Sequence, residues 1–241
     1  MPAPATPVLP ARSPRPRCRP AAVVFDMDGL MLDTEIHAAQ AWTDAAELLG
    51  MDFDRAVTTR LVGHNSPDCM ALIRAHHGPD YPVEALLEAW HGAYETIIER
   101  EGITLKPGLI ELLAWLDAER IPKAVATSTR KVRALAKLTR ARLADRFAAL
   151  VGGDEVARGK PAPDIYLETA ARLGIPAIEC VALEDSEPGI NAALAAGMMP
   201  IMVPDLGAPS SALLARAPLV FASLALVHTH LAALPAPERV R

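Results

Sequence analysis

The sequence has few cysteines and no excess of positive charge, and each of these gaps excludes a class of protein. Its three cysteines, Cys18, Cys69 and Cys180, are odd in number and widely spaced, which argues against a disulfide or zinc framework and favours reduced thiols in a cytoplasmic protein. The formal net charge of −5 provides no basic surface for a phosphate backbone, so we expect no nucleic-acid partner.

Long apolar runs are also missing. The longest, residues 217–227, is interrupted by Pro218 and Ser223 and is well short of the roughly 20 residues that cross a bilayer, so we expect no membrane partner. Residues 1–20 have no apolar segment of a secretory signal and are rich in proline and arginine. We therefore expect a disordered tail there.

The rest of the chain has the composition of a globular protein. Of its 241 residues, 51% are hydrophobic and 22% charged, enough to bury one substantial core and a smaller accessory unit.

The stretch 21–35 contains the first chemical signal. Residues 23–25 are apolar and predict a short buried strand that ends in Asp26 and Asp28. Because side chains alternate along a strand, both carboxylates can face one site, and Gly29 can supply the turn that follows. Two neighbouring acids are costly unless a cation offsets their repulsion or catalysis uses it. Alone, such a pair could equally be a solvated loop.

Residues 36–100 have a helical pattern without strands. Gly50 predicts the end of a first helix, Ser66 and Pro67 predict the N-cap and first turn of a second, and Pro82 predicts the start of a third with one apolar face. A strand–helix–strand unit needs only about 30 residues, so the surplus predicts a small helical domain.

The chain therefore divides into a core and an insert. We predict an α/β core domain formed by residues 21–34 and 103–241, and an all-helical domain formed by residues 35–102. From residue 105 onward, strands and helices alternate as in a Rossmann-like parallel sheet.

Polar clusters follow the predicted strands of this sheet. They are Thr127 with Ser128, Lys160, and Glu184 with Asp185. Taken singly, each cluster could instead be a helix cap or a set of solvated side chains without a catalytic role. Because a parallel sheet binds ligands at the carboxyl ends of its strands, their joint occurrence predicts one site.

The charges in this site predict a metal ion. Asp26, Asp28, Glu184 and Asp185 would meet a phosphorylated substrate, and Lys160 alone cannot neutralise them. The available ligands are oxygen atoms, which favours a hard divalent ion and above all Mg²⁺.

These motifs resemble those of the haloacid dehalogenase superfamily, in order and at suitable spacing. They are Asp26-Met27-Asp28-Gly29, Thr127-Ser128, Lys160-Pro161 and Glu184-Asp185. Further agreement with the β-phosphoglucomutase-like branch comes from Asp33-Thr34-Glu35, Gly159-Lys160-Pro161-Ala162-Pro163-Asp164 and Glu184-Asp185-Ser186 followed by Gly189. The resemblance implies a Rossmann-like core and makes the helical insert a cap over the site.

The resemblance also implies a role for each motif residue. Asp26 would be the nucleophile that forms an aspartyl-phosphate, and Asp28 the general acid and base. Thr127, Ser128 and Lys160 would bind the phosphoryl group.

The implied metal site draws on the same motifs. Asp185 would bind Mg²⁺ with the Asp26 carboxylate and the Asp28 backbone carbonyl. Glu184 would be a further ligand or would support the others.

The expected reaction is hydrolysis of a small phosphomonoester, a sugar phosphate. The alternative is a phosphosugar mutase, but mutases of this branch carry a histidine and an arginine where this chain has Ala38 and Ser66. His64 and Asn65 follow a glycine in a loop that, in the branch this chain resembles, often faces the substrate, so we expect them to contribute to specificity. A non-enzymatic relative would have little reason to keep four costly carboxylates. We expect a small phosphorylated metabolite as partner and a monomer or weak dimer.

Overall fold

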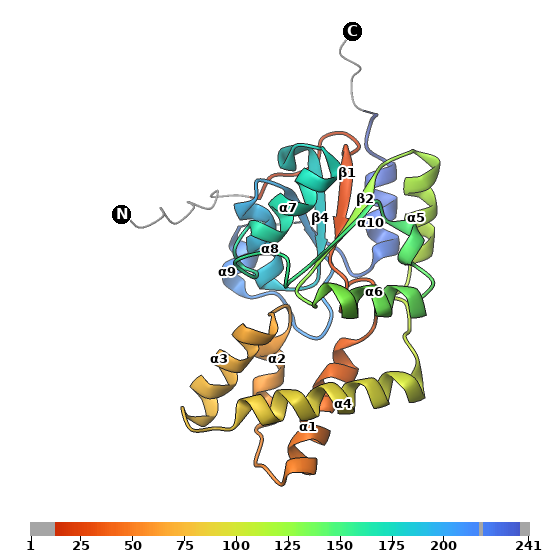
Figure 1. The fold of residues 1–241 in the computed structure, drawn as a ribbon. Coiled ribbons are helices and arrows are strands. Elements are labelled where there is room, and N and C mark those ends of the chain that lie inside the picture. The colour runs from red at the N-terminus through yellow and green to blue at the C-terminus, as the bar shows by residue number, and fades with distance from the viewer. Residues whose placement is uncertain (1–12, 217–218, 237–241) are drawn as a thin grey trace.

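The computed structural model describes residues 13–216 and 219–236, and its centre is a parallel sheet (Figure 1). The six strands lie in the order β3-β2-β1-β4-β5-β6. Their bounds are Ala22–Phe25 (β1), Lys123–Thr127 (β2), Ala149–Gly152 (β3), Cys180–Glu184 (β4), Met199–Met202 (β5) and Leu219–Val220 (β6). The α/β class predicted from the sequence is confirmed, and β6 is a strand that the sequence did not predict.

Strand β1 lies at the point where the strand order reverses. It pairs with β2 on one side and β4 on the other, and Phe25 is in register with Val125 and Leu183. All four residues of β1 are buried, which suits a central strand of a parallel sheet. The residues that follow β1, β2 and β4 therefore emerge side by side at one edge of the sheet.

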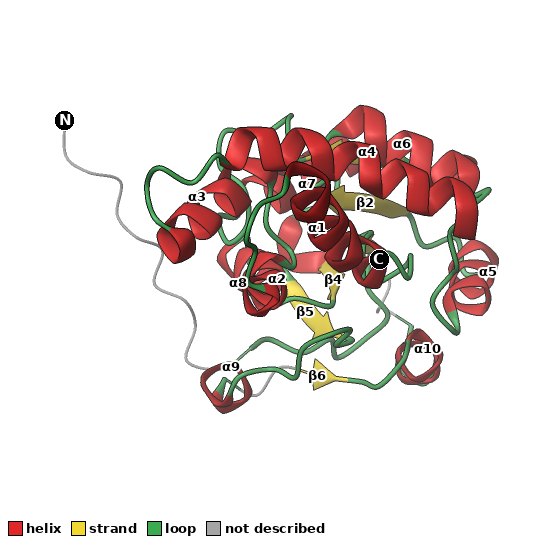
Figure 2. Cartoon of the chain, turned by 90° about the horizontal axis from the view of Figure 1, so that it is seen from below, coloured by secondary structure: helices red, strands yellow, loops and turns green. Residues whose placement is uncertain are grey.

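Helices cover both faces of the sheet (Figure 2). One face packs against α5, α6 and α10, with bounds Leu109–Ala118, Lys131–Arg140 and Leu224–Ala232. The other packs against α7 and α8, with bounds Asp164–Leu173 and Glu187–Ala195. Helix α9, Ser211–Ala215, packs beside α8 and β5. Three short 3₁₀ helices lie at Arg55–Val57, Ala144–Arg146 and Ala177–Glu179.

Four helices form a separate unit at the carboxyl ends of the strands (Figure 1). They are α1 (Glu35–Leu49), α2 (Thr58–Leu61), α3 (Ser66–His77) and α4 (Val83–Glu101), and we call residues 35–101 the helical unit. Its side chains form apolar clusters of their own. These four helices fall within the predicted helical insert, and both its bounds as a separate domain and its action as a cap stay predictions.

The ends of these helices follow the expected chemistry with one correction. Gly50 ends α1 in the left-handed conformation at φ 62°, as predicted. The N-cap of α3 is Asn65 instead of Ser66, because the Asn65 side chain accepts the hydrogen bond of the Asp68 N–H at 2.9 Å. Ser66 and Pro67 are the first two residues of the helix.

Two connections join the helical unit to the core, and they lie side by side. Leu32 and Leu105 form an antiparallel bridge. On either side of it, the Asp33 N–H donates to the Thr104 carbonyl and the Lys106 N–H to the Met31 carbonyl, both at 2.9 Å. The chain therefore leaves the core and returns to it at one place.

The segment before β1 corrects one expectation. Residues 13–20 are not a free tail, because the Ser13 N–H donates to the Arg216 carbonyl at 2.9 Å and the Arg19 guanidinium lies 5.9 Å from the centre of the Trp115 ring. Residues 1–12, the rest of the predicted tail, lie outside the described residues, as do 217–218 of the longest apolar run. In the part of the chain that is described, none of the helices has the length and apolarity needed to span a membrane.

Candidate active site

Asp26 and Asp28 leave the sheet directly after β1. The Asp26 N–H still bonds to the Leu183 carbonyl of β4 at 3.0 Å, which fixes the first carboxylate next to the end of that strand. The chain then turns at Gly29, where φ is +79°. A Cβ atom there would lie 2.3 Å from Asp185 Oδ2, so only glycine allows the turn to approach this carboxylate.

Lys160 joins the carboxylates that follow β1 and β4. Its ammonium group lies 2.5 Å from Asp26 Oδ1, 2.6 Å from Glu184 Oε1 and 3.2 Å from the Ala126 carbonyl oxygen. The lysine residue is only 1% exposed. Burial lowers the pKa of Lys160, but the two carboxylates outweigh it and raise this pKa, so the ammonium is charged.

Both oxygens of Glu184 already have donors within the protein. Tyr166 and Lys160 donate to Oε1, and Ser186 Oγ donates to Oε2 at 3.1 Å. Glu184 is fully buried, and a Cβ on Gly189 would lie 1.9 Å from its Oε1. The packing therefore holds this carboxylate in place against Lys160.

Asp26, Glu184 and Asp185 form a group that suits a metal ion. One oxygen from each lies within 4.8 Å of the others, and all three residues are buried. Asp185 Oδ2 is buried without a hydrogen-bond partner among the described residues. An orphaned carboxylate oxygen beside two other acids fits a hard cation such as Mg²⁺.

The pKa values of these acids show the same need for positive charge. Burial raises the pKa of Asp26 to about 7, although Lys160 pulls it down. Burial, together with the charges of Asp26 and Glu184, raises the pKa of Asp185 well above its usual range. A bound cation would favour the ionised forms of both groups.

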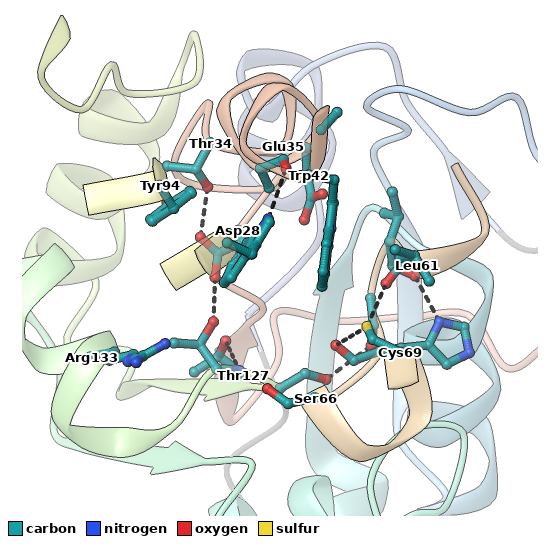
Figure 3. A pocket seen from close by; sticks show the side chains of 18 of the residues that line it. Asp28, Thr34, Glu35, Trp42, Leu61, Ser66, Cys69, Tyr94, Thr127 and Arg133 are labelled. Carbon is teal, nitrogen blue, oxygen red and sulfur yellow. Dashed lines mark hydrogen bonds between the residues drawn. The ribbon is translucent and has the colours of Figure 1, made fainter. Parts of the chain in front are cut away.

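Three side chains of the described residues hold the Asp28 carboxylate. Thr34 donates to Oδ1 at 2.6 Å, as Figure 3 shows. Lys137 donates to Oδ1 at 2.7 Å, and Thr129 donates to Oδ2 at 2.8 Å. Burial raises the pKa of Asp28, but the charge and hydrogen bond of Lys137 outweigh it and the pKa is lowered. Asp28 is therefore a carboxylate in this arrangement.

A cavity lies between the sheet edge and the helical unit (Figure 3). Its core side is lined by Asp26, Asp28, Thr127, Ser128, Thr129, Arg133 and Lys137. Its other side is lined by helical-unit residues that include Glu35, Ala38, Trp42, His64, Ser66 and Tyr94. The two sides are in contact, because the Ser128 hydroxyl donates to the Gly63 carbonyl at 2.9 Å.

The residues expected to set specificity lie in different places. His64 lines the cavity and has its Nδ1 atom 3.1 Å from the Val62 carbonyl oxygen. Asn65 caps α3 and lines a neighbouring groove with Gly159. Its amide packs so closely on Gly159 that a Cβ there would lie 2.0 Å from Asn65 Nδ2.

Sequence reasoning missed several groups that line the cavity. Thr129 and Lys137 contact Asp28, yet neither belongs to a motif. Glu35 appeared only as part of the family pattern, and burial, followed by the charge of Asp28, raises its pKa to about 8. Burial raises the pKa of Tyr94 to about 12. The only available signal was the helical spacing that places Lys137 on the same face of α6 as Arg133.

Comparison with known proteins gives matches over most of the chain. A family model described as haloacid dehalogenase-like hydrolase matches residues 20–197. β-Phosphoglucomutase of Bacillus subtilis is 34% identical over 197 residues, which cover 78% of this chain and 86% of that protein. A phosphorylated carbohydrates phosphatase of Thermotoga maritima is 33% identical over 177 residues, which cover 73% of this chain and 82% of the phosphatase.

Solved structures show the same similarity. The crystal structure of CbbY from Rhodobacter sphaeroides in complex with phosphate matches with a TM-score of 0.72 and 28% identity. The match covers 86% of this chain and 95% of the CbbY chain. Together with the sequence matches, it confirms the resemblance that the motifs indicated.

Proposed function

The chain belongs to the haloacid dehalogenase-like hydrolase family, and we propose that it is a magnesium-dependent phosphatase that hydrolyses a sugar phosphate or a similar small phosphomonoester. The observation that supports this most is the buried Asp26 carboxylate, paired with Lys160 at the carboxyl end of β1 and open to the cavity. The similarity to a phosphatase of phosphorylated carbohydrates supports the substrate class.

In the first step, a carboxylate oxygen of Asp26 attacks phosphorus. A bond between this oxygen and phosphorus forms, the ester bond breaks, and Asp28 in its protonated form gives its proton to the leaving alkoxide. Thr127, Ser128 and Lys160 hold the phosphoryl group during transfer. The product is an aspartyl-phosphate on Asp26 and a free alcohol.

In the second step, water attacks the same phosphorus atom. Its oxygen forms a bond to phosphorus, the bond to Asp26 breaks, and the water proton passes to the Asp28 carboxylate. Inorganic phosphate leaves and Asp26 is a carboxylate again. The ionised Asp28 of the structure is the form that this step needs.

Mg²⁺ would be held by the carboxylates of Asp26 and Asp185 and by the backbone carbonyl of Asp28. When bound, it offsets negative charge at the phosphoryl group and at the carboxylates. The geometry favours a supporting role for Glu184, since Lys160, Tyr166 and Ser186 already occupy its oxygens.

We propose that the helical unit belongs to a cap domain with the predicted bounds 35–102. Its loop at Gly63 already contacts the core through Ser128. The helical unit therefore contacts the core beside the cavity, and we expect it to move relative to the core when substrate enters.

A mutase is the second candidate function, supported by the similarity to β-phosphoglucomutase. The two positions at which this chain departs from the mutase pattern, Ala38 and Ser66, both line the cavity. Neither side chain has a positive charge that could bind a second phosphate. Neither has an imidazole that could control the access of Asp28 to water. This favours transfer to water over transfer to a bound sugar.

The experiment is phosphate release with Mg²⁺ from a panel of sugar phosphates and other small phosphomonoesters. β-Glucose 1-phosphate is followed in parallel for glucose 6-phosphate, and Asp26→Asn is the control. Phosphate release without isomerisation is the expected result. Efficient isomerisation with little phosphate released would support the mutase, and no reaction with any compound would contradict both candidates.

A further inference from the structure

Lys137 touches the core and the helical unit at once. It lies on α6 of the core, with its ammonium group 2.7 Å from Asp28 Oδ1. The same ammonium lies 4.6 Å from the centre of the Tyr94 ring on α4, close enough for a cation–π contact. The side chain of Lys137 is 13% exposed and Tyr94 is 5% exposed, so water screens neither contact strongly.

The contact between Lys137 and Tyr94 lies in the middle of the interface between α4 and α6, which we call the seam. Figures 1 and 2 both show α4 running alongside α6. Arg133 donates to the His91 imidazole on one side of Lys137, and Arg140 pairs with Glu95 at 3.0 Å on the other. The seam therefore fixes the helical unit against the helix that carries Lys137.

Among the three donors to Asp28 in the described part of the chain, only Lys137 is charged. Thr34 and Thr129 can give or accept hydrogen bonds, whereas an ammonium group only donates. Burying a lysine costs free energy that an exposed ion pair on α6 would not require. Stability alone therefore gives little reason for Lys137 to occupy this place.

We propose that Lys137 is a positioning residue that holds the Asp28 carboxylate where it takes the proton of the attacking water. Through the contact of Lys137 with Tyr94, this positioning depends on the packing of the helical unit against the core. The inference rests on the proposed phosphatase reaction. Lys137 keeps its own protons and bonds to neither phosphorus nor water. Its effect is on hydrolysis of the aspartyl-phosphate.

The kinetic test compares Lys137→Met and Lys137→Arg with wild type. Lys131→Met is the matched control, because Lys131 is an exposed lysine of the same helix that pairs with Glu155. Rapid-quench measurements with p-nitrophenyl phosphate and the best ester of the panel give kcat, kcat/KM and the burst of p-nitrophenol.

For Lys137→Met we expect kcat to fall about ten- to hundredfold for both esters, part of the range that a general base contributes. The value of kcat/KM should fall much less, because it reports only the steps up to release of the alcohol. The burst should grow as the aspartyl-phosphate accumulates. Lys137→Arg should recover part of kcat, and Lys131→Met should match wild type. Equal losses in kcat and kcat/KM without a larger burst, or no loss, would overturn the positioning role.

A second measurement needs no turnover. Hydrogen exchange of α4 amides in the ligand-free protein should be faster in Lys137→Met than in wild type, while Lys131→Met should leave it unchanged. In a Tyr94→Leu background, Lys137→Met should add no further increase. Unchanged exchange would overturn the link to the helical unit. If wild type hydrolyses no ester, the phosphatase proposal fails together with the positioning role, whereas exchange still decides whether Lys137 holds α4.

Discussion

The ammonium group of Lys160 lies 2.5 Å from the Asp26 carboxylate, and the two side chains are 1% and 9% exposed. This pair brings a fixed positive charge to the point where the nucleophile meets phosphorus. It also makes Lys160, which pairs with Glu184 as well, part of the buried core. Substitutions at the two residues should therefore have different effects on activity and on stability.

Asp26→Asn should abolish phosphate release and leave the fold intact. The amide nitrogen and oxygen cannot form the aspartyl-phosphate, so we expect at least about a thousandfold loss, the size seen when a nucleophile is removed. Lys160 keeps Glu184 as a partner, so the melting temperature should change by only a few degrees. A phosphate assay and a thermal melt check both statements. Release at the wild-type rate would remove Asp26 as the nucleophile.

Lys160→Met should unfold at a much lower temperature than wild type. The substitution leaves two buried carboxylates, Asp26 and Glu184, without their cation, which costs about 3–5 kcal/mol. For a chain of this length, that corresponds to a fall in Tm of about 10 °C. The melt is best recorded in EDTA, so that no divalent cation takes the place of the ammonium group. An unchanged Tm would show that the pair contributes no net stability.

Removal of the metal should stop turnover, and Mg²⁺ should restore it. Mg²⁺ should also raise the Tm of wild type, because a ligand at one hundred times its dissociation constant adds about 2.7 kcal/mol to the free energy of unfolding. The rise in Tm should be much smaller in Asp185→Asn. Because burial raises the pKa of the ligand Asp26 to about 7, protons compete with the cation, and the Tm shift should be larger at pH 8 than at pH 6. Full activity after EDTA treatment would contradict the metal assignment.

Glu35 should make wild type less stable as the pH rises. Its pKa is about 8 in the fold against an ordinary value of 4.5, so the folded state holds a proton that the unfolded chain has lost between these values. The contribution of Glu35 to the free energy of unfolding is fully present below about pH 4.5 and falls progressively as the pH rises to about 8. The Tm of Glu35→Gln minus that of wild type should therefore increase from pH 5 to pH 8 and then level off. A difference that stays constant with pH would show that Glu35 titrates normally.

Gly63→Ala should weaken substrate binding without loss of the fold. Gly63 has a φ of +78°, and a Cβ atom there would lie 2.4 Å from Ser186 Oγ, so the loop could not approach the core as it does. We expect KM to rise about tenfold, the size of one lost positioning contact. Gly92→Ala is the control, because Gly92 lies in α4 with nothing within 4 Å of its Cβ position. Equal KM values for the two variants would separate this loop from substrate binding.

The sequence predicted the parts of the site that follow strands. Asp26, Thr127 and Asp185 could be placed together because parallel strands carry the residues that follow them to one edge of the sheet. Gly50 could be placed at the end of α1 because a left-handed helix end requires little more than a glycine. These features depend on local chemistry and on topology.

Other features depend on tertiary contacts and were missed. Lys137 lies 109 positions after Asp28 in the chain, and only the packing of α6 beside α4 brings its ammonium to that carboxylate. Helix α10 has no capping pattern beyond Ser223, and the two residues of β6 are too few for any periodic signal. Residues 13–20 have the composition of a tail, yet they are fixed by backbone hydrogen bonds to distant segments.

The paired connections at Leu32 and Leu105 have a consequence for the history of the chain. Because the chain leaves the core and returns at one place, everything between these residues is an insertion that the connectivity of the sheet does not require. Such an insertion can be lengthened, shortened or exchanged without rethreading a strand. The core can therefore keep its reaction while the inserted segment changes. A new substrate preference can arise by replacing that segment without altering the nucleophile.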